Sequence, residues 1–133
     1  MNGYAEKNLS NLCNTVKEWN DAAFAGELDN PIKPCPRENL IITEEVLNHA
    51  KNLVTMITDV ELDIFPTQRG TVQIELEKKT LVNGEKKTLY MEAEIYSDKI
   101  NYFEATVNPV RQLFQQDNFP AEEVAKRFNS MGD

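Results

Sequence analysis

Residues that carry metal or nucleophilic chemistry are scarce in this chain. It has one histidine, His49, and two cysteines, Cys13 and Cys35, among 133 residues. Zinc sites need several His or Cys ligands, and a nucleophilic Ser or Cys needs a neighbouring base such as His. The five glycines are scattered, so there is no glycine-rich loop to hold a phosphate. We therefore expect no cofactor and no metal site, and the sequence does not indicate a reaction.

Basic residues and long apolar runs are also in short supply. Lys and Arg number 14 against 22 Asp and Glu, which gives a formal charge of −8. A chain this acidic is repelled by nucleic-acid phosphates and anionic membranes and attracted to basic proteins or cations. No apolar run approaches the length of a membrane span, and no basic stretch followed by an apolar one opens the chain as a secretory signal does. We expect a cytoplasmic protein with no membrane partner.

Length and composition are those of one globular domain. The 133 residues suffice for a single core, so residues 1–133 are expected to form one domain, and the apolar fraction of 41% is ordinary. Cys13 falls on the apolar stripe of an expected helix, where a cysteine acts as a small buried hydrophobe. Cys35 lies between two prolines. A disulfide between Cys13 and Cys35 is the alternative, and the cytoplasm disfavours it.

Apolar residues recur every three or four positions in the first part of the chain, which predicts helices. One helix is expected over residues 4–25, ended by Gly26. A Pro-rich connector follows over residues 29–36. A second helix is expected to open at Thr43, whose hydroxyl can cap it while Glu44 and Glu45 favour its positive end.

The apolar period then changes to two, which predicts strands. Asn83-Gly84 is a strong hairpin signal, and a two-residue loop there pairs Leu76 with Met91 and Ile74 with Ala93. A five-residue loop over residues 66–70 pairs Ile64 with Val72, and a turn at Ser97-Asp98 pairs Ile95 with Ile100. A slip of one residue would move apolar side chains to the wrong face, so the mutual agreement supports these registers.

Two further helices are expected after the strands. Asn108-Pro109 predicts the start of a short helix, and Asn118 to Pro120 that of a last one, with Val124 and Phe128 turned inward. The fold class is therefore α+β: a four-stranded antiparallel β-meander with helices packed on one face and an acidic open face.

The open face is predicted to gather seven carboxylates with no Lys or Arg among them. The registers place Glu61, Glu75 and Glu92 in one row across three strands. Like charges stacked across strands lower stability, so the arrangement calls for a reason, which the sequence does not name. The expected partner-binding residues add two aromatic side chains and are Asp59, Glu61, Asp63, Glu75, Glu77, Tyr90, Glu92, Glu94 and Phe103.

Two other readings of this acidic face are open. It is a solvated face that keeps the protein in solution, or a cation site. The cation reading is weak because Asp59, Glu61 and Asp63 begin like an EF-hand loop, yet Ile64 stands where the loop needs glycine. Lysines cluster instead near the hairpin tip, and they are too few to overcome the net charge and bind nucleic acid directly.

These observations favour a non-enzymatic acidic binding or inhibitor protein that docks on a basic protein. Carboxylates at the spacing of strand neighbours resemble a row of phosphates, so a nucleic-acid mimic is one form of this hypothesis. Small acidic inhibitors of defence or DNA-processing proteins resemble the chain in charge and size only. One alternative is a structural or assembly subunit that self-associates through exposed aromatics. Another is an enzyme using a carboxylate pair such as Glu75 and Glu92, which would need a cleft.

Overall fold

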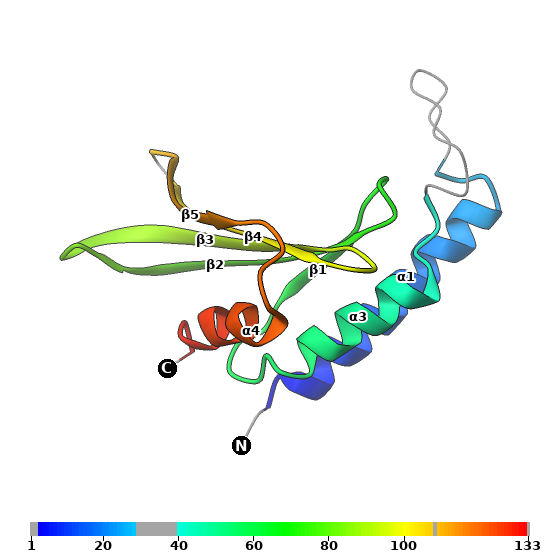
Figure 1. The fold of residues 1–133 in the computed structure, drawn as a ribbon, viewed down its shortest axis with the longest axis horizontal. Coiled ribbons are helices and arrows are strands. Elements are labelled where there is room, and N and C mark those ends of the chain that lie inside the picture. Colours follow the sequence, from blue (N-terminus) through cyan, green and yellow to red (C-terminus); the bar gives the residue numbers. More distant parts are fainter. Residues whose placement is uncertain (1–2, 29–39, 108, 133) are drawn as a thin grey trace.

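The computed structural model describes residues 3–28, 40–107 and 109–132. Over these residues an α+β fold combines three helices with one five-stranded antiparallel sheet (Figure 1). In chain order the elements are α1 (Ala5–Phe24), α3 (Glu44–Val54), β1 (Asp63–Pro66), β2 (Val72–Val82), β3 (Glu85–Ile95), β4 (Ile100–Val107), β5 (Arg111–Gln116) and α4 (Ala121–Asn129). The sheet is a meander, because each strand pairs with the next one along the chain.

The helices lie on one side of the sheet and leave its other face open (Figure 1). Side chains from the helices and from the covered sheet face form the apolar core, whose largest fully buried members include Tyr102, Phe128 and Leu12. This arrangement confirms the predicted fold class in outline. Over the described residues, no helix has the length and apolarity that crossing a membrane requires.

Both N-terminal helices form where the apolar period predicted them. α1 begins one residue after the expected start and ends one residue before the expected end. Gly26 follows it with a left-handed φ of 76°. Thr43 caps α3, since its hydroxyl accepts a hydrogen bond from the Val46 N–H at 3.3 Å. Cys13 is half-buried rather than fully buried. The connector over residues 29–36 and Cys35 lie outside the described residues, so their predicted roles stay predictions.

The central hairpin confirms the predicted register. Asn83 and Gly84 turn the chain with φ angles of 52° and 82°, the left-handed values that a tight two-residue turn requires. Ile74 lies opposite Ala93, and Leu76 lies opposite Met91. Ile95 also pairs with Ile100, as the second turn predicted. Both strands of the hairpin run for 11 residues, so its tip extends beyond β1 and β4.

The predicted register of β1 is wrong by two residues. Ile64 pairs with Ile74 rather than with Val72, and Pro66 is the residue opposite Val72. The connecting turn spans residues 67–71, where the Thr67 N–H donates to the Thr71 carbonyl at 2.9 Å. A shift of two residues keeps every side chain on its face, so the apolar pattern alone could not detect it.

The short helix predicted after the fourth strand is instead the fifth strand. β5 pairs with β4 along its length and carries an irregularity opposite Glu104 and Ala105. Phe114 turns to the covered side, where its ring lies 5.6 Å from that of Phe119 and 6.1 Å from that of Tyr102. Pairing with the free edge of β4 and burial of Phe114 outweigh the weak local helix preference of this segment.

Helix α4 attaches to this corner through a half-buried ion pair. Arg127 places its guanidinium 3.9 Å from the centre of the Phe114 ring and donates to the Glu104 carboxylate at 3.1 Å. Tyr102 donates to the same carboxylate oxygen at 2.5 Å. Burial, reinforced by that hydrogen bond, raises the pKa of Tyr102. Val124 and Phe128 are buried, as the last predicted helix required.

Candidate binding face

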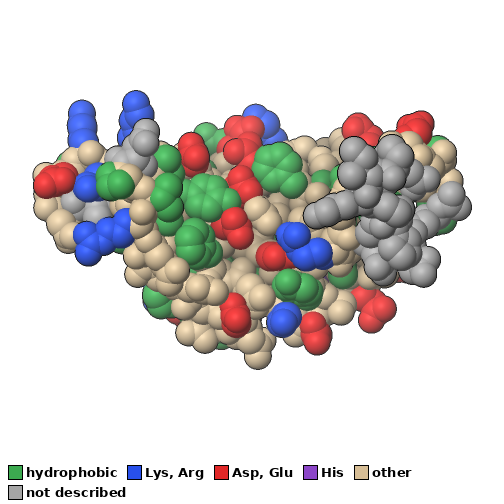
Figure 2. Space-filling model, turned by 90° about the horizontal axis from the view of Figure 1, so that it is seen from above, with side chains coloured by type: hydrophobic (Ala, Val, Ile, Leu, Met, Phe, Trp, Pro, Cys, Tyr) green, Lys and Arg blue, Asp and Glu red, His purple; other side chains and the backbone are tan. Residues whose placement is uncertain are grey.

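The register places five of the seven predicted carboxylates together on the open face. Glu75 and Glu92 lie directly opposite each other on β2 and β3, and Asp63 of β1 lies opposite Glu75. Glu77 and Glu94 occupy the adjacent rows on either side. We call this group the acidic patch; it consists of Asp63, Glu75, Glu77, Glu92 and Glu94. Figure 2 views this face and shows acidic side chains among apolar ones across its middle.

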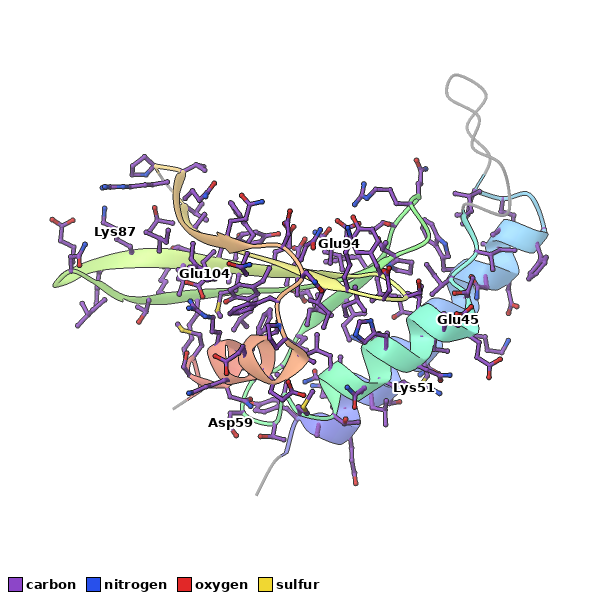
Figure 3. All side chains as sticks on the ribbon, in the orientation of Figure 1. Glu45, Lys51, Asp59, Lys87, Glu94 and Glu104 are labelled. Atoms are coloured by element: carbon purple, nitrogen blue, oxygen red, sulfur yellow. The ribbon has the colours of Figure 1, made fainter. Side chains whose placement is uncertain are left out.

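Asp59 and Glu61 do not belong to the patch, contrary to the sequence prediction. Both precede β1, and the two-residue correction in register leaves no sheet position for them. Asp59 is exposed, and its backbone N–H donates a hydrogen bond to the Asn129 Oδ1 at 3.1 Å. Figure 3 places Asp59 on the helix side of the sheet, away from Glu94. Glu61 forms an ion pair with Lys7 of α1 at 3.1 Å.

The expectation that no Lys or Arg would lie among the carboxylates is also wrong. Arg69, from the turn between β1 and β2, donates through Nε to the Glu94 carboxylate at 2.8 Å. The Thr71 hydroxyl donates to the same oxygen at 2.6 Å. Partial burial works to raise the pKa of Glu94, but the hydrogen bonds from Thr71 and Arg69 outweigh it and hold the pKa below its ordinary value. The negative charge of Glu94, at the edge of the patch, is therefore paired with the positive charge of Arg69.

Glu75 and Glu92 are half-buried carboxylates with no cationic partner among the described residues. Neutral neighbours hold them instead. Gln73 donates to Glu75 at 2.5 Å, and the Tyr90 hydroxyl donates to Glu92 at 2.6 Å. Each donor sits two residues along the same strand, on the same face. The two carboxylates are thus fixed in orientation while their charges face each other.

Aromatic side chains adjoin this carboxylate pair. The Tyr90 and Phe103 rings meet edge to face with centres 6.4 Å apart, as expected for two side chains predicted to share the outer face. Phe103 lies directly opposite Glu92 on β4. Burial, together with hydrogen bonding to Glu92 and Glu75, raises the pKa of Tyr90, so its hydroxyl stays protonated and acts as a donor. The centre of the face therefore combines half-buried aromatics with half-buried negative charge.

Sequence reasoning missed Phe65 and Arg69 on this face. Phe65 lies opposite Gln73, beside the patch, and is 48% exposed. The alternation that makes Ile64 inward already turns Phe65 outward, so extending the first strand by one residue would have found it. No comparable signal identified Arg69, because its contact with Glu94 joins a turn to a strand two elements away in sequence.

The hairpin tip carries the opposite charge on the same face. Lys79, Leu81 and Lys86 follow Glu77 along the open side, with Leu81 directly opposite Lys86. All three are exposed, Leu81 to 67%. Lys78 donates to the Met131 carbonyl, and Lys87 pairs with Glu85 at 3.6 Å. Figure 3 places Lys87 near the tip of the hairpin. A hollow of about 810 Å³ lies between this tip and the end of α4.

No group of three or more His, Cys, Asp or Glu side chains in the described part of the chain is arranged to hold a metal ion. His49 is a half-buried boundary residue whose Nδ1 lies 2.6 Å from the Tyr96 carbonyl oxygen. Comparison with protein-family models, curated proteins and solved structures finds no match.

Proposed function

We propose that the protein is a non-enzymatic acidic binding protein whose open face docks on a basic protein surface. The observation that carries this proposal is the Glu75–Glu92 pair, two half-buried carboxylates directly opposite each other with no cation between them. Directly opposed like charges on neighbouring strands destabilise a sheet. A basic side chain of a partner would relieve that repulsion, so the isolated protein holds a site prepared for positive charge.

The surroundings of the pair suit a protein partner. Tyr90 and Phe103 offer aromatic area next to the charges, and aromatic side chains ringed by polar groups are typical of binding hot spots. The hydrogen bonds from Gln73 and Tyr90 orient the carboxylates before binding, which lowers the entropy lost on association. Rows of carboxylates about 4.8 Å apart across strands also suit a surface that normally receives phosphates. We therefore infer a nucleic-acid-binding protein as the partner class, with the acidic patch in place of phosphate groups.

The proposal is tested by two double variants that change net charge equally. Glu75→Lys with Glu92→Lys reverses the centre of the patch, and Glu122→Lys with Glu123→Lys reverses two exposed acids in the first turn of α4. Basic proteins retained from a host lysate by the wild type are identified and then measured singly by surface plasmon resonance. The patch variant should associate more slowly and show a flatter salt dependence, and the helix variant should behave nearly as the wild type.

A third variant examines the aromatic anchor. Tyr90→Ala should mainly speed dissociation, because packed aromatic contacts form after the first encounter and then hold the complex together. Equal losses of binding in the patch and helix variants would mean that only net charge matters. The proposal that the open face is the docking surface would then be wrong.

A further inference from the structure

A tyrosine, a glutamate and a phenylalanine form a compact unit at the centre of the open face. Tyr90 and Glu92 lie two residues apart on β3, and Phe103 lies opposite Glu92 on β4. The Tyr90 hydroxyl donates to Glu92 at 2.6 Å, and its ring meets that of Phe103 with centres 6.4 Å apart. All three side chains are half-buried. We call this unit the open cluster.

The same unit occurs a second time on the covered face, one strand further along the sheet. Tyr102 and Glu104 lie two residues apart on β4, and Phe114 lies opposite Glu104 on β5. The Tyr102 hydroxyl donates to Glu104 at 2.5 Å, and its ring centre lies 6.1 Å from that of Phe114. We call this unit the covered cluster. Its spacing, strand pairing and hydrogen bond repeat those of the open cluster.

The covered cluster shows which side chain completes such a unit. Arg127 of α4 donates to the Glu104 carboxylate at 3.1 Å and holds its guanidinium over the Phe114 ring, 3.9 Å from the ring centre. One arginine therefore pairs with the carboxylate and covers the aromatic ring at the same time. A guanidinium can do both because it is planar, donates in several directions and is weakly hydrated, whereas a lysine ammonium is a compact, strongly hydrated charge.

The open cluster carries more negative charge than the covered one. Glu75 lies opposite Glu92 on β2. The corresponding position in the covered cluster, opposite Glu104 on β3, is held by the uncharged Met91. Neither Glu75 nor Glu92 takes part in an ion pair within the described part of the chain. The open cluster thus has the carboxylate and the ring of its counterpart, a second carboxylate, and no arginine from the described residues.

We propose that an arginine of the partner protein completes the open cluster, with its guanidinium over the Phe103 ring and donating to Glu92 and Glu75. This inference rests on the proposed function and deepens it by naming the side chain that the partner presents. The planar fork of arginine matches carboxylates and phosphates alike, so it is common in nucleic-acid recognition. The arginine therefore agrees with the partner class inferred above.

The shape of the open face favours a long, projecting side chain. Figure 1 shows β5 and the turn between β1 and β2 rising from the sheet on the side away from the helices. A flat protein surface would meet these segments before it reached the middle of the face. An arginine extends well beyond its own backbone, so it reaches the open cluster between them.

NMR titration of the full chain with blocked amino acids tests the proposal without a partner protein. The probes, at constant ionic strength and up to about 50 mM, are N-acetyl-arginine amide, N-acetyl-lysine amide and N-acetyl-citrulline amide, the last shaped like arginine but uncharged. The arginine probe should shift the ring signals of Tyr90 and Phe103 and bind about threefold or more tightly than the lysine probe. The citrulline probe should bind about tenfold more weakly than arginine, because it lacks the charge for the carboxylates.

Two conservative variants separate the ring from the charge. Phe103→Leu removes the ring but keeps an apolar side chain, so the preference for arginine over lysine should disappear. Glu92→Gln keeps the side-chain shape and should weaken arginine binding by about tenfold. The matched control Glu122→Gln, exposed on α4, should leave it unchanged. Spectra of the free variants show whether each is folded, and the selectivity of the wild type decides the question in either case.

Equal affinity for the arginine and lysine probes, or shifts that leave Tyr90 and Phe103 unaffected, would overturn the arginine inference. Its failure differs from that of the proposed function. A wild type without arginine selectivity that still retains a basic protein, and loses it in E75K/E92K, would refute the arginine inference alone. Selective arginine binding with no basic protein retained from the lysate would leave the arginine site standing and refute the docking function.

Discussion

Neutralising Glu75 should stabilise the isolated protein. Glu75 lies directly opposite Glu92 on one side and Asp63 on the other, and none of the ion pairs in the described residues involves it. Each directly opposed like-charge pair costs roughly 0.2–1 kcal/mol. Glu75→Gln removes both repulsions and still offers an amide oxygen to the Gln73 donor. We expect a gain of about 1 kcal/mol, which for a chain of this size raises Tm by about 4 °C.

Urea unfolding of dilute protein at about pH 7 measures this gain. The control, Glu122→Gln in the first turn of α4, should instead cost a few tenths of a kcal/mol, because it removes a favourable charge from the helix N-terminus. A Glu75→Gln protein that is clearly less stable at pH 7 would refute the reasoning, since the bonds to the carboxylate would then outweigh its repulsion.

Three further outcomes are expected from the fold. Asn8→Ala should destabilise the protein by about 3 kcal/mol in urea unfolding, since the buried amide bonds the backbone of three residues before β1; a loss below 1 kcal/mol would contradict it. Phe114→Ala should cost about 2 kcal/mol and speed amide exchange in β5 more than in β2, because that ring anchors the edge strand to α4. Glu94 has a lowered pKa in the fold, so its contribution is present above its ordinary pKa and is lost as pH falls through the folded value; NMR titration should give the low pKa in the wild type and a higher one in Arg69→Gln.

Local patterns in the sequence were sufficient for most of the fold. The 3.6-residue period located α1 and α3, the Thr43 cap marked where α3 begins, and Asn83-Gly84 set the register of β2 against β3. Those features depend on residues close together in the chain. For the same reason the Glu75–Glu92 pair and its Tyr90 neighbour were predictable, since one hairpin carries all three.

Tertiary structure decided what local pattern leaves open. Side chains alternate with a period of two, so the apolar pattern could not distinguish a β1 register from one shifted by two residues, and only the turn over residues 67–71 excluded Glu61 from the acidic patch. Residues 111–116 became a strand because the free edge of β4 and the pocket for Phe114 were available beside them. The pairing of Arg69 with Glu94 likewise joins separate elements. These outcomes depend on long-range contacts, whose free energies exceed the weak preferences that a short segment has by itself.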